Sequence, residues 1–121
     1  MTGATPEEMI KYFGSRKKLF KIHFRNVSGP LPHFSETLID DGYYDMSKIM
    51  QALVDIDFDG IMIPDHVPTV GGPAGGGQGR RGGGGQQGGP PPQYRPSPGL
   101  AYLLGSMHAM LKSAQNHKRK G

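Results

Sequence analysis

A long stretch rich in glycine, proline and glutamine, residues 71–98, limits what this chain can fold into. Such a composition buries too little apolar surface to offset the entropy lost on ordering, so we predict a flexible insert. Of the 121 residues, about ninety remain to form a core, which is enough for one small domain. The chain contains no cysteine, which excludes disulfide bonds and thiolate ligands from its own residues.

Two segments before the insert carry helix signals. Thr5 is a suitable N-cap, because Pro6 and two acids follow it in the first turn, and Gly14 is placed to end this helix. Asp45 caps a second predicted helix, whose apolar residues repeat at helical spacing. These residues are Met46, Ile49, Met50, Leu53 and Val54.

Two apolar segments are predicted as strands, one from about Leu19 to Phe24 and one from Ile61 to Ile63. The pattern of the first strand indicates burial mainly on both faces. A long connection with turn signals, residues 27–44, and the second helix lie between the strands. The order strand, helix, strand predicts a βαβ unit with parallel strands and a right-handed crossover.

A third helix is predicted after the insert, from about Gly99 to Gln115, with leucines and methionine on one face. The predicted organisation is therefore a βαβ segment (1–70), the insert (71–98), a helix (99–116) and a basic tail (117–121). Two parallel strands and three helices do not complete an α/β domain, because parallel strands need both faces covered and neighbours at both edges. We therefore predict a piece of a larger parallel sheet or barrel.

Polar side chains follow both predicted strands: His23 and Arg25 after the first, Asp65 and His66 after the second. The carboxyl ends of neighbouring parallel strands lie about 5 Å apart, so these side chains can converge. An imidazole with a carboxylate suits Mn²⁺, Fe²⁺ or Zn²⁺. Arg25 can bind a carboxylate through two parallel hydrogen bonds. His66 points away from Asp65 on a strand, which favours a role as acid or base.

Each of these residues also has an ordinary interpretation. A histidine at a strand end is commonly a hydrogen-bonded structural residue, and a catalytic metal takes three or more protein ligands. Glu36 in the long connection is usable as a ligand or a base, although a solvated loop acid is its default interpretation. His108 and His117 are predicted to be bystanders.

An ordered series of motifs runs through the chain outside the insert. They are HFRNV (23–27), FSET (34–37), DDG (40–42), DM (45–46), FDG (58–60), PDHVP (64–68) and PGLAYLLG (98–105). Together they resemble the C-terminal part of the mannonate dehydratase family, over nearly all of residues 5–115. The resemblance implies an α/β fold, namely the C-terminal portion of a (β/α)8 TIM barrel of the xylose-isomerase-like kind. Such a barrel takes about 250 residues, so this chain would hold roughly its last third.

The resemblance also implies a function. Family members remove water from D-mannonate to give 2-dehydro-3-deoxy-D-gluconate in hexuronate and glucuronate catabolism, using Mn²⁺ or Fe²⁺. Carried onto this sequence, His23 and Asp65 are metal ligands and His66 is catalytic. The family uses a tyrosine near the last helix, for which Tyr94 and Tyr102 are candidates, and we assign Tyr102.

The first part of the family's barrel supplies further ligands, a histidine and a cysteine, that this chain lacks. We therefore expect D-mannonate as substrate and a separately encoded N-terminal part, or a homo-oligomer, to complete the enzyme. No apolar run approaches the roughly 20 residues that cross a bilayer, and the N-terminus lacks a signal-peptide pattern, which predicts a cytoplasmic location.

An alternative function is a nonenzymatic nucleic-acid-binding adaptor. Gly-Arg-Arg-Gly around Arg80, the net charge of +4 and the tail from His117 to Lys120 favour it. The default interpretation of the Arg-Gly segment is a flexible loop, and that of the basic tail is a solvated chain end. The discriminating measurement is salt-sensitive RNA binding that requires residues 71–98.

Overall fold

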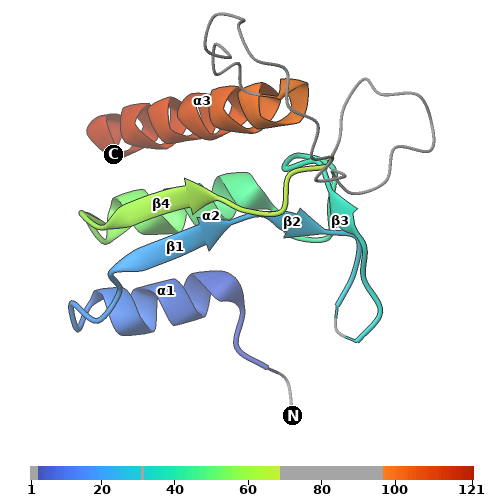
Figure 1. Cartoon of the computed structure of the whole chain (residues 1–121). Helices are drawn as coiled ribbons and strands as arrows, with labels where there is room; N and C mark the ends of the chain where they lie inside the picture. Colours follow the sequence, from blue (N-terminus) through green and yellow to red (C-terminus); the bar gives the residue numbers. More distant parts are fainter. Residues whose placement is uncertain (1–2, 31, 69–96) are drawn as a thin grey trace, which may run out of the picture.

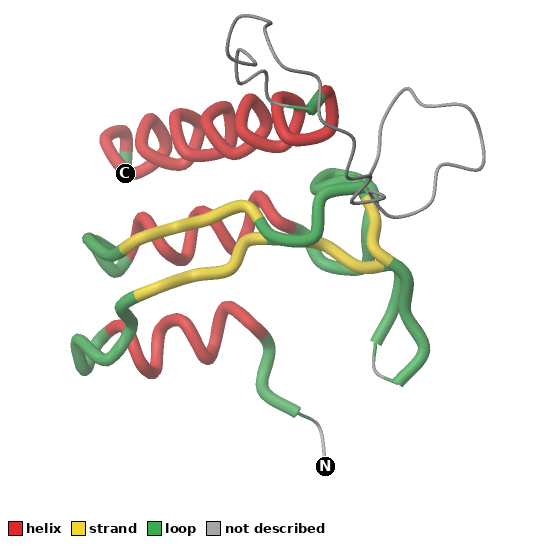
Figure 2. Tube along the Cα trace, in the orientation of Figure 1, coloured by secondary structure: helices red, strands yellow, loops and turns green. Residues whose placement is uncertain are grey.

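The computed structural model describes residues 3–30, 32–68 and 97–121. In chain order these residues form α1 (Pro6–Gly14), β1 (Lys21–Phe24), β2 (Asn26–Val27), β3 (Glu36–Thr37), α2 (Met46–Asp55), β4 (Ile61–Pro64) and α3 (Pro98–Lys120) (Figures 1 and 2). The result is a mixed α/β structure with three helices and a parallel strand pair in its described part. Most of the predicted insert, including Arg80, Arg81 and Tyr94, lies outside the described residues.

Strands β1 and β4 pair in parallel, with Lys21 opposite Ile61 and Phe24 opposite Pro64. This pairing confirms the predicted parallel βαβ unit, because α2 lies between the two strands in the sequence. Both arrowheads in Figure 1 point toward the short β2–β3 hairpin, so the two carboxyl ends share one edge of the structure. The residues that follow each strand therefore meet beside that hairpin.

The predicted helix starts are confirmed by their caps. Thr5 Oγ1 accepts a hydrogen bond from the Glu8 amide, while the Thr5 amide donates to the Glu8 carboxylate, which forms a capping box. Asp45 accepts from the Lys48 amide at the start of α2. Each cap satisfies an amide that the helix itself leaves without a partner.

Helix α3 runs to Lys120 rather than ending near Gln115, so the predicted solvated tail is helical as far as Lys120. Lys118 anchors this last part: its Nζ donates to the Val54 carbonyl at 2.9 Å and to Asp57 Oδ1 at 2.6 Å. Positive side chains also suit the C-terminal end of a helix dipole. The sequence pattern missed this extension because the anchor comes from a distant part of the chain.

The Lys118 contact predicts a pH dependence of stability. The hydrogen bond from Lys118 lowers the pKa of Asp57 below its ordinary value of 3.8. A carboxyl whose folded pKa is depressed stabilises the fold above its unfolded pKa, and this contribution is lost as the pH falls through the folded pKa. We expect Asp57→Asn to lower the urea midpoint at about pH 6 and to match the wild type at about pH 2. Asp59→Asn, at an exposed neighbouring acid, is the matched control, and an equal effect of both variants would contradict the prediction.

The core lies between the helices and one face of the β1–β4 pair. Ile22 and Met62 pack against this core, whereas Lys21, His23 and Ile61 on the other face are exposed. The expectation that the first strand is buried on both faces is therefore wrong for the described part of the chain, because its helices contact one face only. The buried apolar residues are Ile10, Phe24, Ile39, Met46, Ile49, Met50, Ala52, Leu53, Leu103, Met107 and Ala114.

The hairpin of β2 and β3 was not predicted from the sequence. Its strands are antiparallel, with Asn26 opposite Thr37 and Val27 opposite Glu36. The buried Asn26 side chain closes the connection that follows: its Nδ2 donates to the carbonyls of Ile39 and Tyr44, and its Oδ1 accepts from the amides of Val27 and Tyr44. One side chain thus ties β2 to Ile39 and Tyr44, in the second half of the predicted long connection.

Two glycines mark places where the backbone packs tightly. A Cβ at Gly42 would lie 2.3 Å from Asn26 Cγ, so this glycine gives the amide side chain its space. A Cβ at Gly99 would lie 2.3 Å from the Pro68 carbonyl oxygen. The first turn of α3 therefore rests directly on the segment that follows β4.

Candidate active site at the strand ends

The structure brings four of the sequence-predicted site residues together at the carboxyl ends of β1 and β4. His23 Nδ1 lies 3.3 Å from Asp65 Oδ2, and Arg25 Nε lies 4.0 Å from the same oxygen. His66 Nε2 lies 3.5 Å from Asp65 Oδ1. Because the parallel register sets His23 opposite Ile63, His23 also lies near Asp65, which is 42 positions later in the sequence. Asp65 is the centre of this cluster, with a basic or imidazole group on each side.

His66 has a backbone conformation that explains its direction. Its φ is +46°, in the left-handed region that a residue with a side chain seldom adopts. The chain turns at this residue as it leaves β4, so the imidazole faces back toward the cluster. Its Nδ1 lies 3.5 Å from Glu36 Oε1, and its Nε2 faces Asp65. This orientation lets one imidazole contact two carboxylates. The expectation that His66 points away from Asp65 is therefore wrong, because β4 ends at Pro64 and His66 lies in the turn beyond the strand.

Glu36 belongs to the same cluster, which corrects its default interpretation as a solvated loop acid. Its Oε1 accepts a hydrogen bond from Arg25 Nη1 at 2.9 Å, and its Oε2 is buried with no hydrogen-bond partner among the described residues. The β2–β3 pairing places Glu36 here, opposite Val27. The signals in the sequence were an acid in the connection between the strands and its place in the FSET motif (34–37).

The metal prediction can be tested against the geometry of the donors. A separation of 3.3 Å between His23 Nδ1 and Asp65 Oδ2 is the spacing of two adjacent ligands at about 2.1 Å from one ion. The described residues contain no group of three or more His, Cys, Asp or Glu side chains arranged to hold a metal ion. His23 and Asp65 therefore fit two positions of a coordination sphere that needs further ligands.

Tyr102 lies on the first turns of α3 and lines a narrow cavity with Arg25, Asp65 and His66. Its hydroxyl donates to Asp40 Oδ2 at 2.5 Å. This hydrogen bond raises the pKa of Tyr102 above its ordinary value, because the neutral hydroxyl is the donor. The structure thus places Tyr102 beside the cluster with its hydroxyl held by Asp40.

The remaining histidines of the described chain lie apart from this cluster. His33, His108 and His117 are exposed, and no ion pair or hydrogen bond found between described residues joins them to it. That His108 and His117 are bystanders stays a prediction.

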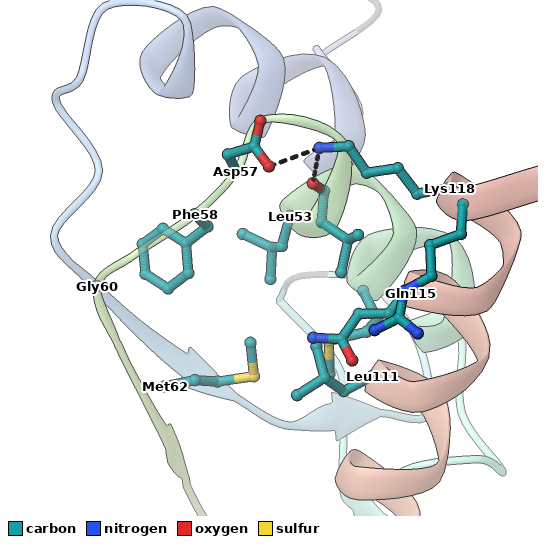
Figure 3. A pocket seen from close by; sticks show the side chains of 11 residues that line it. Leu53, Asp57, Phe58, Gly60, Met62, Leu111, Gln115 and Lys118 are labelled. Atoms are coloured by element: carbon teal, nitrogen blue, oxygen red, sulfur yellow. Dashed lines mark hydrogen bonds and ion pairs between the residues drawn. The ribbon is translucent and has the colours of Figure 1, made fainter. Parts of the chain in front are cut away.

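A larger hollow, of about 530 Å³, lies between α2, α3 and β4 (Figure 3). Its walls are mainly apolar, as the side chains of Leu53, Phe58, Met62 and Leu111 show in the figure. The one acid that lines it, Asp57, is bound to Lys118. The hollow lies beside the start of β4, whereas the polar cluster follows its end, so we place the chemistry at the cluster.

The described fold and cluster define an α/β protein with a polar site at the carboxyl ends of parallel strands. Comparison with known protein families identifies the family. The family model of D-mannonate dehydratase (UxuA) matches residues 3–116. This chain belongs to the D-mannonate dehydratase family.

Individual relatives carry the same name. A mannonate dehydratase of Enterococcus faecalis is 43% identical over 61 residues, which cover 48% of this chain and 16% of that protein. One of Thermotoga petrophila is 36% identical over 78 residues, which cover 58% of this chain and 21% of that protein. The chain therefore matches about a fifth of the length of these curated relatives.

A solved structure agrees with the sequence comparisons. The mannonate dehydratase of Streptococcus suis serotype 2 matches 89% of this chain and 28% of its own chain, with a TM-score of 0.58 and 28% identity. The structural likeness thus extends over nearly all of this chain and a little over a quarter of the solved one. A search of the described helices finds none with the length and apolarity needed to span a membrane.

Proposed function

We propose that this chain forms the strand-end part of a mannonate dehydratase active site, which converts D-mannonate to 2-dehydro-3-deoxy-D-gluconate and water. Family membership over residues 3–116 carries the proposal. The convergence of His23, Arg25, Asp65 and His66 at one edge supports it, because these side chains supply the donor types that a sugar acid and a divalent cation need.

His23 and Asp65 would hold a divalent metal, Mn²⁺ or Fe²⁺, through Nδ1 and a carboxylate oxygen. A bound divalent cation neutralises charge on the substrate carboxylate and increases the acidity of the hydrogen at C2. Further ligands would come from outside the described residues of this chain. The substrate and the metal are each required by the proposed reaction.

The other residues of the cluster have roles that follow from their chemistry. Arg25 would bind the carboxylate of the sugar acid, for which a guanidinium provides two parallel donors. His66 would exchange a proton with the substrate, since an imidazole changes its protonation near neutral pH. Dehydration needs one group to accept the proton from C2 and another to protonate the C3 hydroxyl as its C–O bond breaks. Tyr102, beside Asp65 and His66, would take part in one of these transfers.

The remainder of the active site would come from a partner, either a separately encoded N-terminal part or further copies of this chain. The chain would be the C-terminal portion of a TIM barrel, and the exposed residues Lys21, His23 and Ile61 would then face the barrel interior. Such interiors are packed with side chains from all strands. We place the reaction in hexuronate catabolism in the cytoplasm.

Metal binding by the chain tests the proposal without requiring turnover. Electron paramagnetic resonance of free Mn²⁺, recorded with the missing N-terminal part of the family domain present, is expected to show binding that weakens at least about tenfold in His23→Ala and in Asp65→Ala, because each removes a ligand. His108→Ala, at an exposed histidine of α3, is the matched control and should bind as the wild type does. Equal binding by all four proteins would remove the two ligands from the proposal.

Turnover provides the second test. D-mannonate dehydration is measured with Mn²⁺ or Fe²⁺, for the chain alone and together with the missing N-terminal part of the family domain. We expect metal-dependent product formation in the completed assembly. Folded protein without turnover in either case would overturn the proposed activity.

A further inference from the structure

Glu36 is, with Asp65, one of two carboxylates in the described cluster that contact both Arg25 and His66. Its Oε1 is 2.9 Å from Arg25 Nη1 and 3.5 Å from His66 Nδ1. The side chain of Glu36 is 31% exposed and that of Arg25 is 33% exposed, so water screens the pair only partly. The contact joins a residue of β3 to the ends of both parallel strands.

Arg25 has two acids within reach, Glu36 and Asp65, and the contact with Glu36 affects how closely it approaches Asp65. Arg25 lies 2.9 Å from Glu36 and 4.0 Å from Asp65, so the shorter ion pair is the one with Glu36. Without the carboxylate of Glu36, Asp65 is the next acid within reach of the guanidinium. Asp65 would then turn toward Arg25 and away from His23, which now lies 3.3 Å from its Oδ2.

The backbone around Glu36 is held in place, so its position is a property of the fold. Val27 pairs with Glu36 in the hairpin, and the Ser28 amide donates to the Ser35 carbonyl at 2.9 Å. The Ser35 amide in turn donates to the Ser28 hydroxyl. Beyond β3, the buried Asn26 side chain binds the carbonyl of Ile39. Glu36 is thus fixed on both sides along the chain.

We propose that Glu36 is a positioning residue of this site: its carboxylate engages Arg25 and faces His66, which leaves Asp65 directed toward His23. The inference rests on the proposed function, because it assigns Glu36 a task among residues that bind the metal and the substrate. Glu36 acts through its neighbours and is not assigned a contact with substrate.

Side-chain NMR of the metal-free 121-residue chain tests the proposal. A guanidinium held by a carboxylate rotates slowly about Nε–Cζ and exchanges its Nε hydrogen slowly. We expect Glu36→Gln, which keeps the shape and removes the charge, to accelerate both processes at Arg25 several-fold, because Asp65 replaces only part of the contact that Glu36 makes. The backbone amide protection of α2 should stay as in the wild type, which separates loss of the ion pair from general loosening.

The controls isolate the carboxylate of Glu36. Thr37→Val changes the next residue of β3 without removing a charge, and Asp57→Asn breaks an acid–base pair elsewhere; both should leave Arg25 unchanged. Glu36→Asp keeps the charge but shortens its reach, so its rates at Arg25 should fall between those of the wild type and Glu36→Gln. If Glu36→Gln does not fold, the comparison of Glu36→Asp with the wild type decides.

Unchanged Arg25 rates in the folded Glu36 variants would overturn the positioning role. That result would leave the metal proposal intact, because Mn²⁺ binding depends on His23 and Asp65 and is measured separately. Conversely, if the chain together with the missing N-terminal part fails to bind Mn²⁺ while Glu36→Gln releases Arg25, this inference is retained and the proposed function is lost.

Discussion

Asn26→Ala is expected to destabilise the fold by about 3–5 kcal/mol, because it leaves one buried and three partly buried backbone groups without this partner. The Asn26 side chain is 2% exposed and uses both of its donors and its acceptor. Its removal takes away the hydrogen-bond partner of the carbonyls of Ile39 and Tyr44 and of the amides of Val27 and Tyr44. Each unsatisfied buried group costs about 1–3 kcal/mol, and partial access of water reduces the sum.

Urea denaturation followed by circular dichroism measures the effect of Asn26→Ala. Asn116→Ala provides the matched control, since Asn116 is an exposed residue of α3 and alanine suits a helix. The control should be neutral or slightly stabilising. If Asn26→Ala matches it, the amide is not what holds the connection between β2 and α2.

Phe24→Ala is expected to destabilise the fold by about 3–4 kcal/mol, through lost burial and the cavity that remains. Phe24 is 1% exposed and lies between His23 and Arg25, on the side of β1 that faces the helices. The substitution therefore removes the apolar contact that fixes the end of β1 against the core. We also expect faster amide exchange at Arg25 in this variant, because the strand end loses its anchor.

Phe20→Ala is the control for Phe24→Ala, because it deletes the same side chain just before the same strand. Phe20 is 72% exposed, so its removal should cost less than about 0.5 kcal/mol. Denaturation midpoints of the two variants give the comparison. Similar losses would show that burial in the described structure does not determine the stability of this chain.

The sequence predicted the elements whose signals are local. The capping residues Thr5 and Asp45 and the apolar repeat of α2 lie within a few residues of what they specify, and the structure has these elements where they were predicted. Parallel pairing also followed, because a helix between two strands leaves a crossover as the simple connection. The family resemblance is confirmed by the match over residues 3–116.

Features that depend on distant contacts were missed. The extension of α3 depends on Lys118 reaching Val54 and Asp57, more than sixty positions earlier in the chain. The β2–β3 hairpin depends on Asn26, whose partners spread as far as Tyr44. At the site, the motif positions predicted His23 and Asp65 as candidate ligands. The contact between Glu36 and Arg25 became visible only with the pairing of β2 and β3. The roles of these side chains remain predictions that the metal and NMR experiments address.

The contact between Gly99 and Pro68 has a consequence for how this chain tolerates changes in length. The two residues touch, so the described segment that ends at Pro68 and the one that begins at residue 97 lie next to each other. A connection between adjoining anchor points places little demand on its own length, and doubling a flexible loop costs only about 0.6 kcal/mol. We therefore expect that residues can be inserted or deleted between these anchors, over evolution or by engineering, while α3 stays packed beside the strand ends.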